Sequence, residues 1–205
     1  MFRMTPQKAI WYGWLACWVF IALFVSYIGM EYVVVQVSQK DLPLRYITPV
    51  QSLIYCVLFL TFLNSVRAFA QLRKDESLEK TANTLLLVNV AEVILMIPYS
   101  FPDYMDPTFL VIVLAALIPL LCVNGIVLIR IADHFTAYVD EFGASAKRVT
   151  LWNRIAGWML ASVVLALPGV FVSLIGEFFL WRFLAKVIKQ NYVATPVPVS
   201  AQTTV

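Results

Sequence analysis

Charged side chains are scarce in this chain of 205 residues. Asp, Glu, Lys and Arg make up 13% of it, whereas apolar residues make up 61%. Soluble proteins have about 25% charged and about 45–50% apolar residues. A soluble domain of this size would lack the polar side chains needed to cover its surface. The composition therefore excludes an ordinary cytosolic enzyme and a disordered chain, and it predicts an integral membrane protein.

Residues that commonly serve as metal ligands or catalytic groups are also few. The sequence has one histidine, His134, and three cysteines that all fall inside apolar runs. It contains no phosphate-binding loop, no nucleophile elbow and no zinc-binding motif. We therefore expect no metal and no cofactor, and an enzyme is a less favoured class of function. The net charge of +3 is too small to predict a nucleic-acid partner.

Long uncharged runs are abundant instead. Four runs contain 21 to 23 uncharged residues, and a fifth, of 22 residues, carries the single charge of Glu92. Each approaches the roughly 20 residues that a helix needs to cross the hydrocarbon of a bilayer. We predict an all-α, polytopic membrane bundle that forms one domain over residues 1–190. Its five spans lie at 9–30, 46–66, 81–102, 107–129 and 155–176.

Two further segments follow the last predicted span. Residues 177–190 place apolar side chains on one side of a helix and Arg182, Lys186 and Lys189 on the other. This pattern favours a helix that lies in the headgroup region and contacts anionic lipid headgroups, although a plain polar flank is the alternative. Residues 191–205 are rich in Pro, Ser and Thr, which predicts a disordered tail.

The positive charges orient the chain. Ten Lys and Arg residues fall on the N-terminal side of the predicted spans, and only Lys40 and Arg45 fall between the first and second spans. Cytoplasmic loops carry the excess of positive charge in membrane proteins. The N-terminus is therefore predicted to be cytoplasmic and Asp103 external, in a bacterial inner membrane or a plasma membrane.

The basic residues Arg182, Lys186 and Lys189 conflict with five full spans. Five spans would place them outside, which changes the count of positive residues to 10 inside and 5 outside. If the last run turns back, the count becomes 13 to 2. Pro168 and Gly169 form a natural hinge, because proline removes a helical hydrogen bond and glycine accepts unusual backbone angles. A kinked fifth helix and a re-entrant hairpin both remain open.

Glu92 is the most informative single residue, because it lies near the middle of a predicted span. Asn89 precedes it by three residues and shares its helix face. Tyr55 lies at about the same depth and is the predicted hydrogen-bond partner, and Asn124 of the fourth span could join this polar site. Such a carboxyl serves either as a protonated group that locks helices together or as part of a proton or ion relay.

Small residues four positions apart predict close helix contacts. Gly157 and Ala161 form one such pair, and Gly169 and Ser173 form another. Pairs of this kind let two helix backbones approach, either within one chain or between copies of it.

Three classes of function fit these features. The first is a non-catalytic membrane subunit that anchors, scaffolds or senses for a partner, which is another protein subunit or a second copy of the chain. It would suit the membrane component of a two-gene bacterial module. The second is an oligomeric ion channel or small proton-coupled transporter that uses Glu92. The third is an intramembrane enzyme that acts on lipid.

Overall fold

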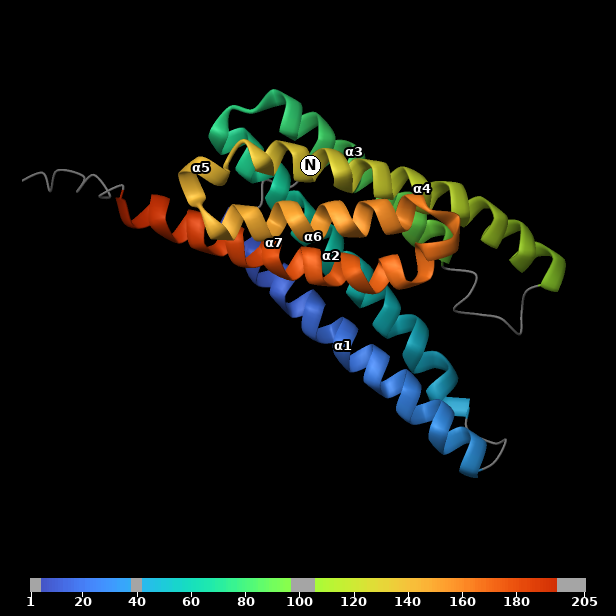
Figure 1. Ribbon diagram of the computed structural model, residues 1–205. Helices are drawn as coiled ribbons and strands as arrows, with labels where there is room; N and C mark the ends of the chain where they lie inside the picture. Colours follow the sequence, from blue (N-terminus) through green and yellow to red (C-terminus); the bar gives the residue numbers. More distant parts are fainter. Residues whose placement is uncertain (1–4, 38–41, 97–105, 195–205) are drawn as a thin grey trace, which may run out of the picture.

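The computed structural model describes residues 5–37, 42–96 and 106–194, and these parts are helical without any strand (Figure 1). The prediction of an all-α fold is thereby confirmed. The end of the third predicted span, Asp103 and most of the C-terminal tail lie outside the described residues. The elements are α1 (Pro6–Val37), α2 (Leu42–Arg73), α3 (Glu76–Met96), α4 (Pro107–Thr136), α5 (Val139–Phe142), α6 (Ala144–Ala161), the 3-10 turn η3 (Val163–Leu165) and α7 (Ala166–Ala194).

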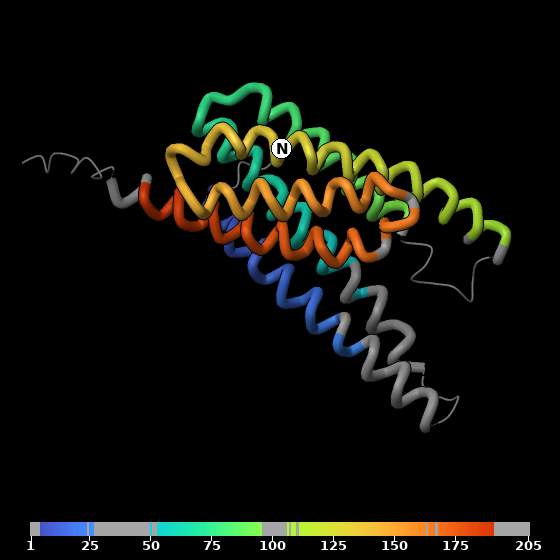
Figure 2. Tube along the Cα trace, viewed as in Figure 1, coloured from blue at the N-terminus to red at the C-terminus, as the bar shows by residue number. Residues whose placement is uncertain are grey.

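The long helices form three antiparallel pairs, α1 with α2, α3 with α4, and α6 with α7. The tube in Figure 2 follows the chain through them, and the α6–α7 pair lies between the other two. A short turn joins α2 to α3, where the side chain of Asp75 accepts a hydrogen bond from the backbone N–H of Leu78 at 2.9 Å. This cap satisfies a backbone donor at the start of α3, so α3 can begin directly after the turn.

The fifth uncharged run, residues 155–176, is not one helix. α6 ends at Ala161, Ser162 is extended, and α7 begins at Ala166 after the single turn of η3. α7 then runs back beside α6 (Figure 1). A continuous fifth helix with a kink is therefore wrong, and the hairpin alternative is the one observed. The reversal also precedes the predicted hinge, because Pro168 sits in the first turn of α7, where its missing N–H costs no helical hydrogen bond.

The amphipathic segment 177–190 is a continuous part of α7 rather than a separate surface helix. Its apolar side is buried against the rest of the bundle, with Leu180, Phe183, Leu184, Val187 and Ile188 all at most 2% exposed. The expectation that this side lies in the lipid headgroups is therefore wrong, since α2, α4 and α6 cover it. Its basic residues stay on the outside of the bundle.

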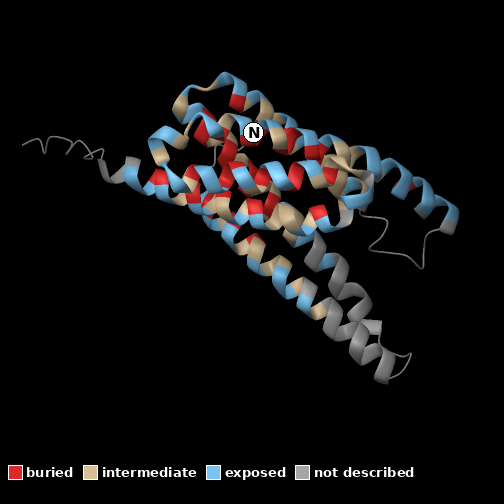
Figure 3. Ribbon diagram, in the orientation of Figure 1, coloured by how far each residue is buried: buried red, intermediate tan, exposed pale blue. Residues whose placement is uncertain are grey.

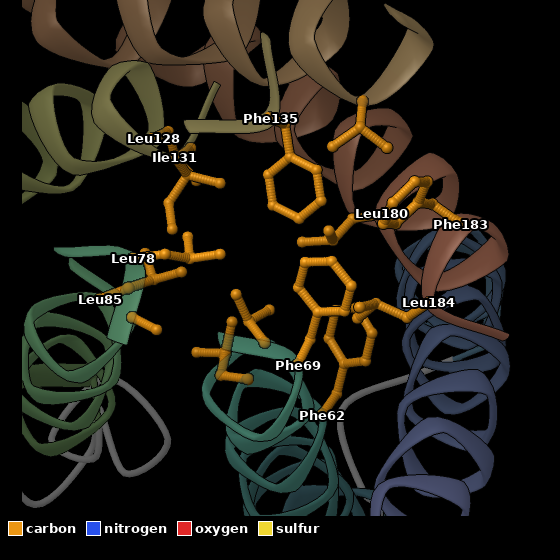
Figure 4. Packing of buried hydrophobic residues seen from close by; sticks show 14 of the residues in the cluster. Phe62, Phe69, Leu78, Leu85, Leu128, Ile131, Phe135, Leu180, Phe183 and Leu184 are labelled. Atoms are coloured by element: carbon orange, nitrogen blue, oxygen red, sulfur yellow. The ribbon is translucent and has the colours of Figure 1, made fainter. Parts of the chain in front are cut away.

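The core is concentrated where α2, α4, α6 and α7 meet, as the buried residues in Figure 3 show. Phe69 of α2, Phe135 of α4 and Phe183 of α7 point toward one another in Figure 4. The ring centroids of Phe135 and Phe183 are 5.2 Å apart in an edge-to-face arrangement, and Phe69 stacks on Phe135 at 5.8 Å. Such pairs add about 0.5–1.5 kcal/mol each beyond the burial of their area.

Two segments of the described helices, Leu53–Arg73 and Val111–Thr136, are long and apolar enough to cross a membrane by length and composition. Other parts of the bundle expose large apolar side chains as well. Trp158 is 65% exposed, and Val164, at the tip of the α6–α7 hairpin, is 88% exposed. Together with the two apolar segments, these exposed side chains give weak support for contact with a membrane.

α4 and α6 contact each other through their backbones. A Cβ atom added to Gly157 would lie 2.6 Å from the carbonyl oxygen of Gly125, and one added to Gly125 would lie 2.5 Å from the backbone nitrogen of Ala161. No side chain fits between these two backbones. The small residues predicted to permit close approach therefore lie at a contact within the chain.

Replacing Gly157 by Leu should separate α4 from α6 and lower the thermal unfolding temperature in detergent. Overpacked cores lose about 1–3 kcal/mol, and this site should reach the upper part of that range because backbone atoms cannot move aside. The matched control is Trp158→Leu at the neighbouring exposed position, which should unfold close to the wild-type temperature. Equal effects of the two substitutions would contradict the backbone contact.

Candidate functional site

Glu92 lies on the side of α3 that faces α4, and its partner is Asn124. The side-chain nitrogen Nδ2 of Asn124 donates to both carboxyl oxygens of Glu92, at 3.0 and 3.1 Å. Tyr55, the partner expected from its depth, instead stacks on Phe59 with ring centroids 5.6 Å apart. The hydrogen bond goes to Asn124 rather than to Tyr55, because α4 presents a polar side chain to Glu92.

Asn89 and Asn124 are both buried, but they are used differently. Asn89 donates to the carbonyl oxygen of Leu85 on its own helix at 2.9 Å, so it does not reach Glu92 through that group. The oxygen Oδ1 of Asn124 is buried and has no hydrogen-bond partner among the described residues. An unpaired buried acceptor costs about 1–3 kcal/mol. The site therefore has a place for one more donor, such as a water molecule or a carboxyl proton.

A second carboxyl, that of Glu177 on α7, acts on the same site through its charge. Glu177 and Glu92 are electrostatic neighbours, and both are neighbours of Tyr55. Sequence reasoning missed Glu177, because a continuous fifth span would have put it at a membrane surface. In the hairpin it is the twelfth residue of α7 and lies beside the bundle interior. The excess of positive charge after it was the one sequence signal that favoured this placement.

The site thus consists of the Glu92 carboxyl of α3 and the Asn124 amide of α4, and Glu177 and Tyr55 interact with Glu92 through charge only. Carboxyls at membrane depth are costly and commonly mark proton or ion pathways, although they also serve as interhelical contacts. In the described ranges, no three His, Cys, Asp or Glu side chains gather in a way that could hold a metal ion. His134 contacts Thr81 instead, with 3.3 Å between Nε2 and the threonine oxygen.

The second small-residue pair lies at the α6–α7 hairpin. A Cβ atom on Gly169 would come within 2.9 Å of the backbone nitrogen of Leu160, so α6 and α7 touch through their backbones here. Ser173 donates to the carbonyl oxygen of Val170 at 2.7 Å, within its own helix. Both predicted pairs therefore lie in helices that pack against each other within one chain.

A polar network holds the end of the bundle that carries the α2–α3 turn. The hydroxyl of Tyr138 donates to Asp75 at 2.9 Å, while Arg73 pairs with Glu141 and lies over the ring of Tyr138 at 5.4 Å. Partial burial would raise the pKa of Asp75, but hydrogen bonds from Leu78 and Tyr138 lower it overall. Burial and the neighbouring Asp75 raise the pKa of Tyr138 to about 12, so the phenol keeps its proton.

The basic residues Arg182, Lys186 and Lys189 are exposed at this same end. Arg148 of α6 lies next to them, with its guanidinium 5.9 Å from the ring centroid of Phe179. α2, α4 and α6 also bring basic residues to this end, among them Arg73, Arg130 and Lys147. The molecule therefore has one strongly basic end and a polar site in the middle of the bundle.

Comparison of the chain with protein families, curated proteins and solved structures finds no match. Two features of the molecule bear on its function, the site around Glu92 and the basic end. They lie apart along the bundle, since Glu92 is in the last quarter of α3 and the basic end is at the start of that helix.

Replacing Glu92 by Gln should be mild and replacing it by Lys severe. Gln keeps an acceptor for Nδ2 of Asn124 and should cost about 1 kcal/mol or less, the net worth of one hydrogen bond. Lys at this depth costs about 2.5–3.5 kcal/mol on insertion scales and offers Asn124 no acceptor. The measurement is the amount of folded protein in membranes together with thermal unfolding in detergent.

The control is Thr84→Lys, at an exposed position two turns earlier on α3, which should accumulate normally. If Glu92→Gln accumulates as poorly as Glu92→Lys, the hydrogen bond to Asn124 does not explain the presence of the carboxyl.

Proposed function

We propose that this chain is a multi-pass membrane protein whose basic end faces the cytoplasm. The observation that carries the proposal is the α6–α7 hairpin, which returns Arg182, Lys186 and Lys189 to the end that carries the α2–α3 turn. This arrangement corresponds to the count of 13 positive residues against 2, rather than 10 against 5. The positive-inside rule favours the larger asymmetry.

In this arrangement α1, α2, α3 and α4 cross the bilayer, and the α6–α7 hairpin enters from the cytoplasmic side and returns. α6 has 18 residues, which corresponds to about 27 Å at 1.5 Å per residue. Lys147, Arg148 and Arg154 stay on the cytoplasmic side, so only residues 155–161 of α6, about 10 Å, enter the hydrocarbon core, which is about 30 Å thick. The exposed Val164 at the tip then lies in lipid. The membrane is a bacterial inner membrane or a plasma membrane.

The function that this arrangement supports best is that of a non-catalytic subunit that anchors, scaffolds or senses for a partner. Its exposed surface is largely apolar where it would meet lipid, and basic at the end where a protein could dock. The partner is another protein subunit or a second copy of the chain. Anionic lipid headgroups would surround the same end, since each nearby basic residue attracts them by about 1 kcal/mol.

The second candidate is an oligomeric channel or proton-coupled transporter. The observation in its favour is the meeting of Glu92 with Asn124 and Glu177 in the middle of the bundle, where the buried oxygen of Asn124 still lacks a donor. Here Glu92 would carry the proton. No feature of the described residues adds support for the third class, an intramembrane enzyme that acts on lipid.

Cysteine labelling should place the C-terminal end of α7 in the cytoplasm. With Cys17, Cys56 and Cys122 replaced by Ser, single cysteines at positions 80, 147 and 190 should react with an impermeant reagent only from the cytoplasmic side. A cysteine at position 103 should react from outside. Labelling of position 190 from outside would restore five full spans and contradict the proposed arrangement.

The assembly state tests the proposed role. In native membranes the wild-type chain should migrate as part of a larger assembly, and replacing Arg182, Lys186 and Lys189 by Gln should reduce that assembly while leaving membrane insertion intact. The matched control replaces Lys80, Arg130 and Lys147 by Gln. It removes the same charge from exposed positions on α3, α4 and α6 rather than α7, and it should leave the assembly unchanged.

The purified chain in vesicles should carry no proton or ion flux. Flux that disappears in Glu92→Gln, at a normal protein level, would instead establish the second candidate.

A further inference from the structure

A pocket opens between the first turns of α6 and the second half of α7, at the basic end. Its volume is about 390 Å³, and α6 contributes Ala144, Ser145 and Arg148 to its lining, whereas α7 contributes Phe179, Arg182, Phe183 and Lys186. This volume falls in the range of roughly 300–1,000 Å³ that is typical of small-molecule sites. The pocket lies well away from Glu92, so it is a separate feature of the molecule.

Three positive side chains line the pocket without a carboxylate among them. In the described parts of the chain, ion pairs join Arg67 to Glu79, Arg73 to Glu141 and Arg154 to Asp133, so none of them neutralises Arg148, Arg182 or Lys186. Glu141 is close in sequence to the pocket, but Arg73 engages it. Three like charges repel one another unless an anion lies between them, and their convergence therefore favours a bound anion.

The start of α6 adds backbone donors to this positive surface. α6 is 18 residues long, and no side chain caps its first turn. The N–H groups of a first helical turn have no partner within the helix, and they lie at the positive end of its dipole. Gly143 precedes this turn with a φ of 58°, which residues with side chains rarely adopt. The glycine permits the sharp reversal from α5 that leaves Ala144 and Ser145 beside the basic residues.

Aromatic rings hold one of the basic residues in place. The guanidinium of Arg148 on α6 lies over the ring of Phe179 on α7. Trp152, one turn after Arg148 on α6, stacks on the same ring, with the centroids 6.1 Å apart and an interplanar angle of 9°. Phe183, on the same side of α7, is buried in the core. A guanidinium on a stacked ring is oriented before a ligand arrives, which lowers the entropy cost of binding. Arginine also suits phosphate oxygens, since it offers parallel N–H donors.

We propose that this pocket binds a phosphate group, carried either by an anionic lipid headgroup or by a soluble phosphate compound. Arg148 and Arg182 bind its oxygens from the two walls, Lys186 adds a third positive charge, and the first turn of α6 donates backbone hydrogen bonds. A lipid as the source rests on the proposed function, which places this end at the cytoplasmic leaflet. Binding of the phosphate group itself rests only on the pocket.

The test uses the purified full chain in detergent and measures the dissociation constants of short-chain phosphatidic acid, short-chain phosphatidylcholine and inorganic phosphate. Phosphatidic acid should bind at least tenfold more tightly than phosphatidylcholine, because the choline group cancels the charge of the phosphate. Competition by inorganic phosphate would identify a general phosphate site, and binding of phosphatidic acid without such competition would identify a lipid as the source. Both results support binding of a phosphate group in the pocket.

Two neighbouring residues of α6 provide a matched pair of variants. Arg148→Gln should weaken binding of phosphatidic acid at least tenfold, whereas Lys147→Gln, which removes the same charge outside the pocket, should change it less than twofold. Ala144→Trp fills the pocket while keeping every charge, and it should also weaken binding at least tenfold. Thermal unfolding identifies any variant that has lost its fold.

Three results would each contradict phosphate binding in the pocket. They are equal binding of phosphatidic acid and phosphatidylcholine, equal effects of Arg148→Gln and Lys147→Gln, and wild-type binding by a folded Ala144→Trp variant. The second of these would indicate diffuse attraction to the basic end. Because binding is measured in detergent on the isolated chain, failure of the predicted topology or assembly leaves this test unaffected.

Discussion

The contact between the backbones of α4 and α6 is the constraint on which much of this molecule depends. Gly125 and Gly157 let the two helices touch, so α6 lies against α4 along its length and α7 follows it back. This places the α6–α7 hairpin between the other two pairs. Glu177 then reaches the neighbourhood of Glu92, and the second half of α7 comes to lie beside the first turns of α6.

The bundle separates its polar groups into two places with different physical roles. In the middle, Glu92 and Asn124 satisfy much of each other's need for hydrogen bonds where water is scarce, which is the condition under which an unpaired group is most costly. At the basic end, charges stay exposed and are paired only in part. The first arrangement stabilises the contact between α3 and α4, and the second leaves charge available to a partner or a ligand.

These two places make the candidate functions separable. A role as a membrane subunit needs the basic end and tolerates a neutral residue at position 92, whereas a role in proton transport needs the carboxyl itself. The phosphate pocket lies at the basic end, so this end would bind a phosphate group from the lipid or from the solution around it. Residues of α6 serve both parts of the molecule, since Gly157 packs on α4 and Arg148 lines the pocket.

Composition and the spacing of charges were enough to predict an all-helical chain, the approximate extent of its first four long helices and a basic end, because an uncharged run of about 20 residues has few alternatives to a helix. They also predicted that Glu92 lies inside the third long helix, although it falls in the last quarter of α3 rather than at its middle. Tertiary structure alone decided that Asn124 is the partner of Glu92, that the last run reverses at Ser162 and that Glu177 lies half-buried within α7 rather than at the end of a fifth span. It likewise buried the apolar side of residues 177–190, which an amphipathic pattern assigns equally well to lipid or to protein. The physical reason is that periodicity specifies which side of a helix is apolar, whereas the neighbour that covers that side depends on how closely the other helices can approach.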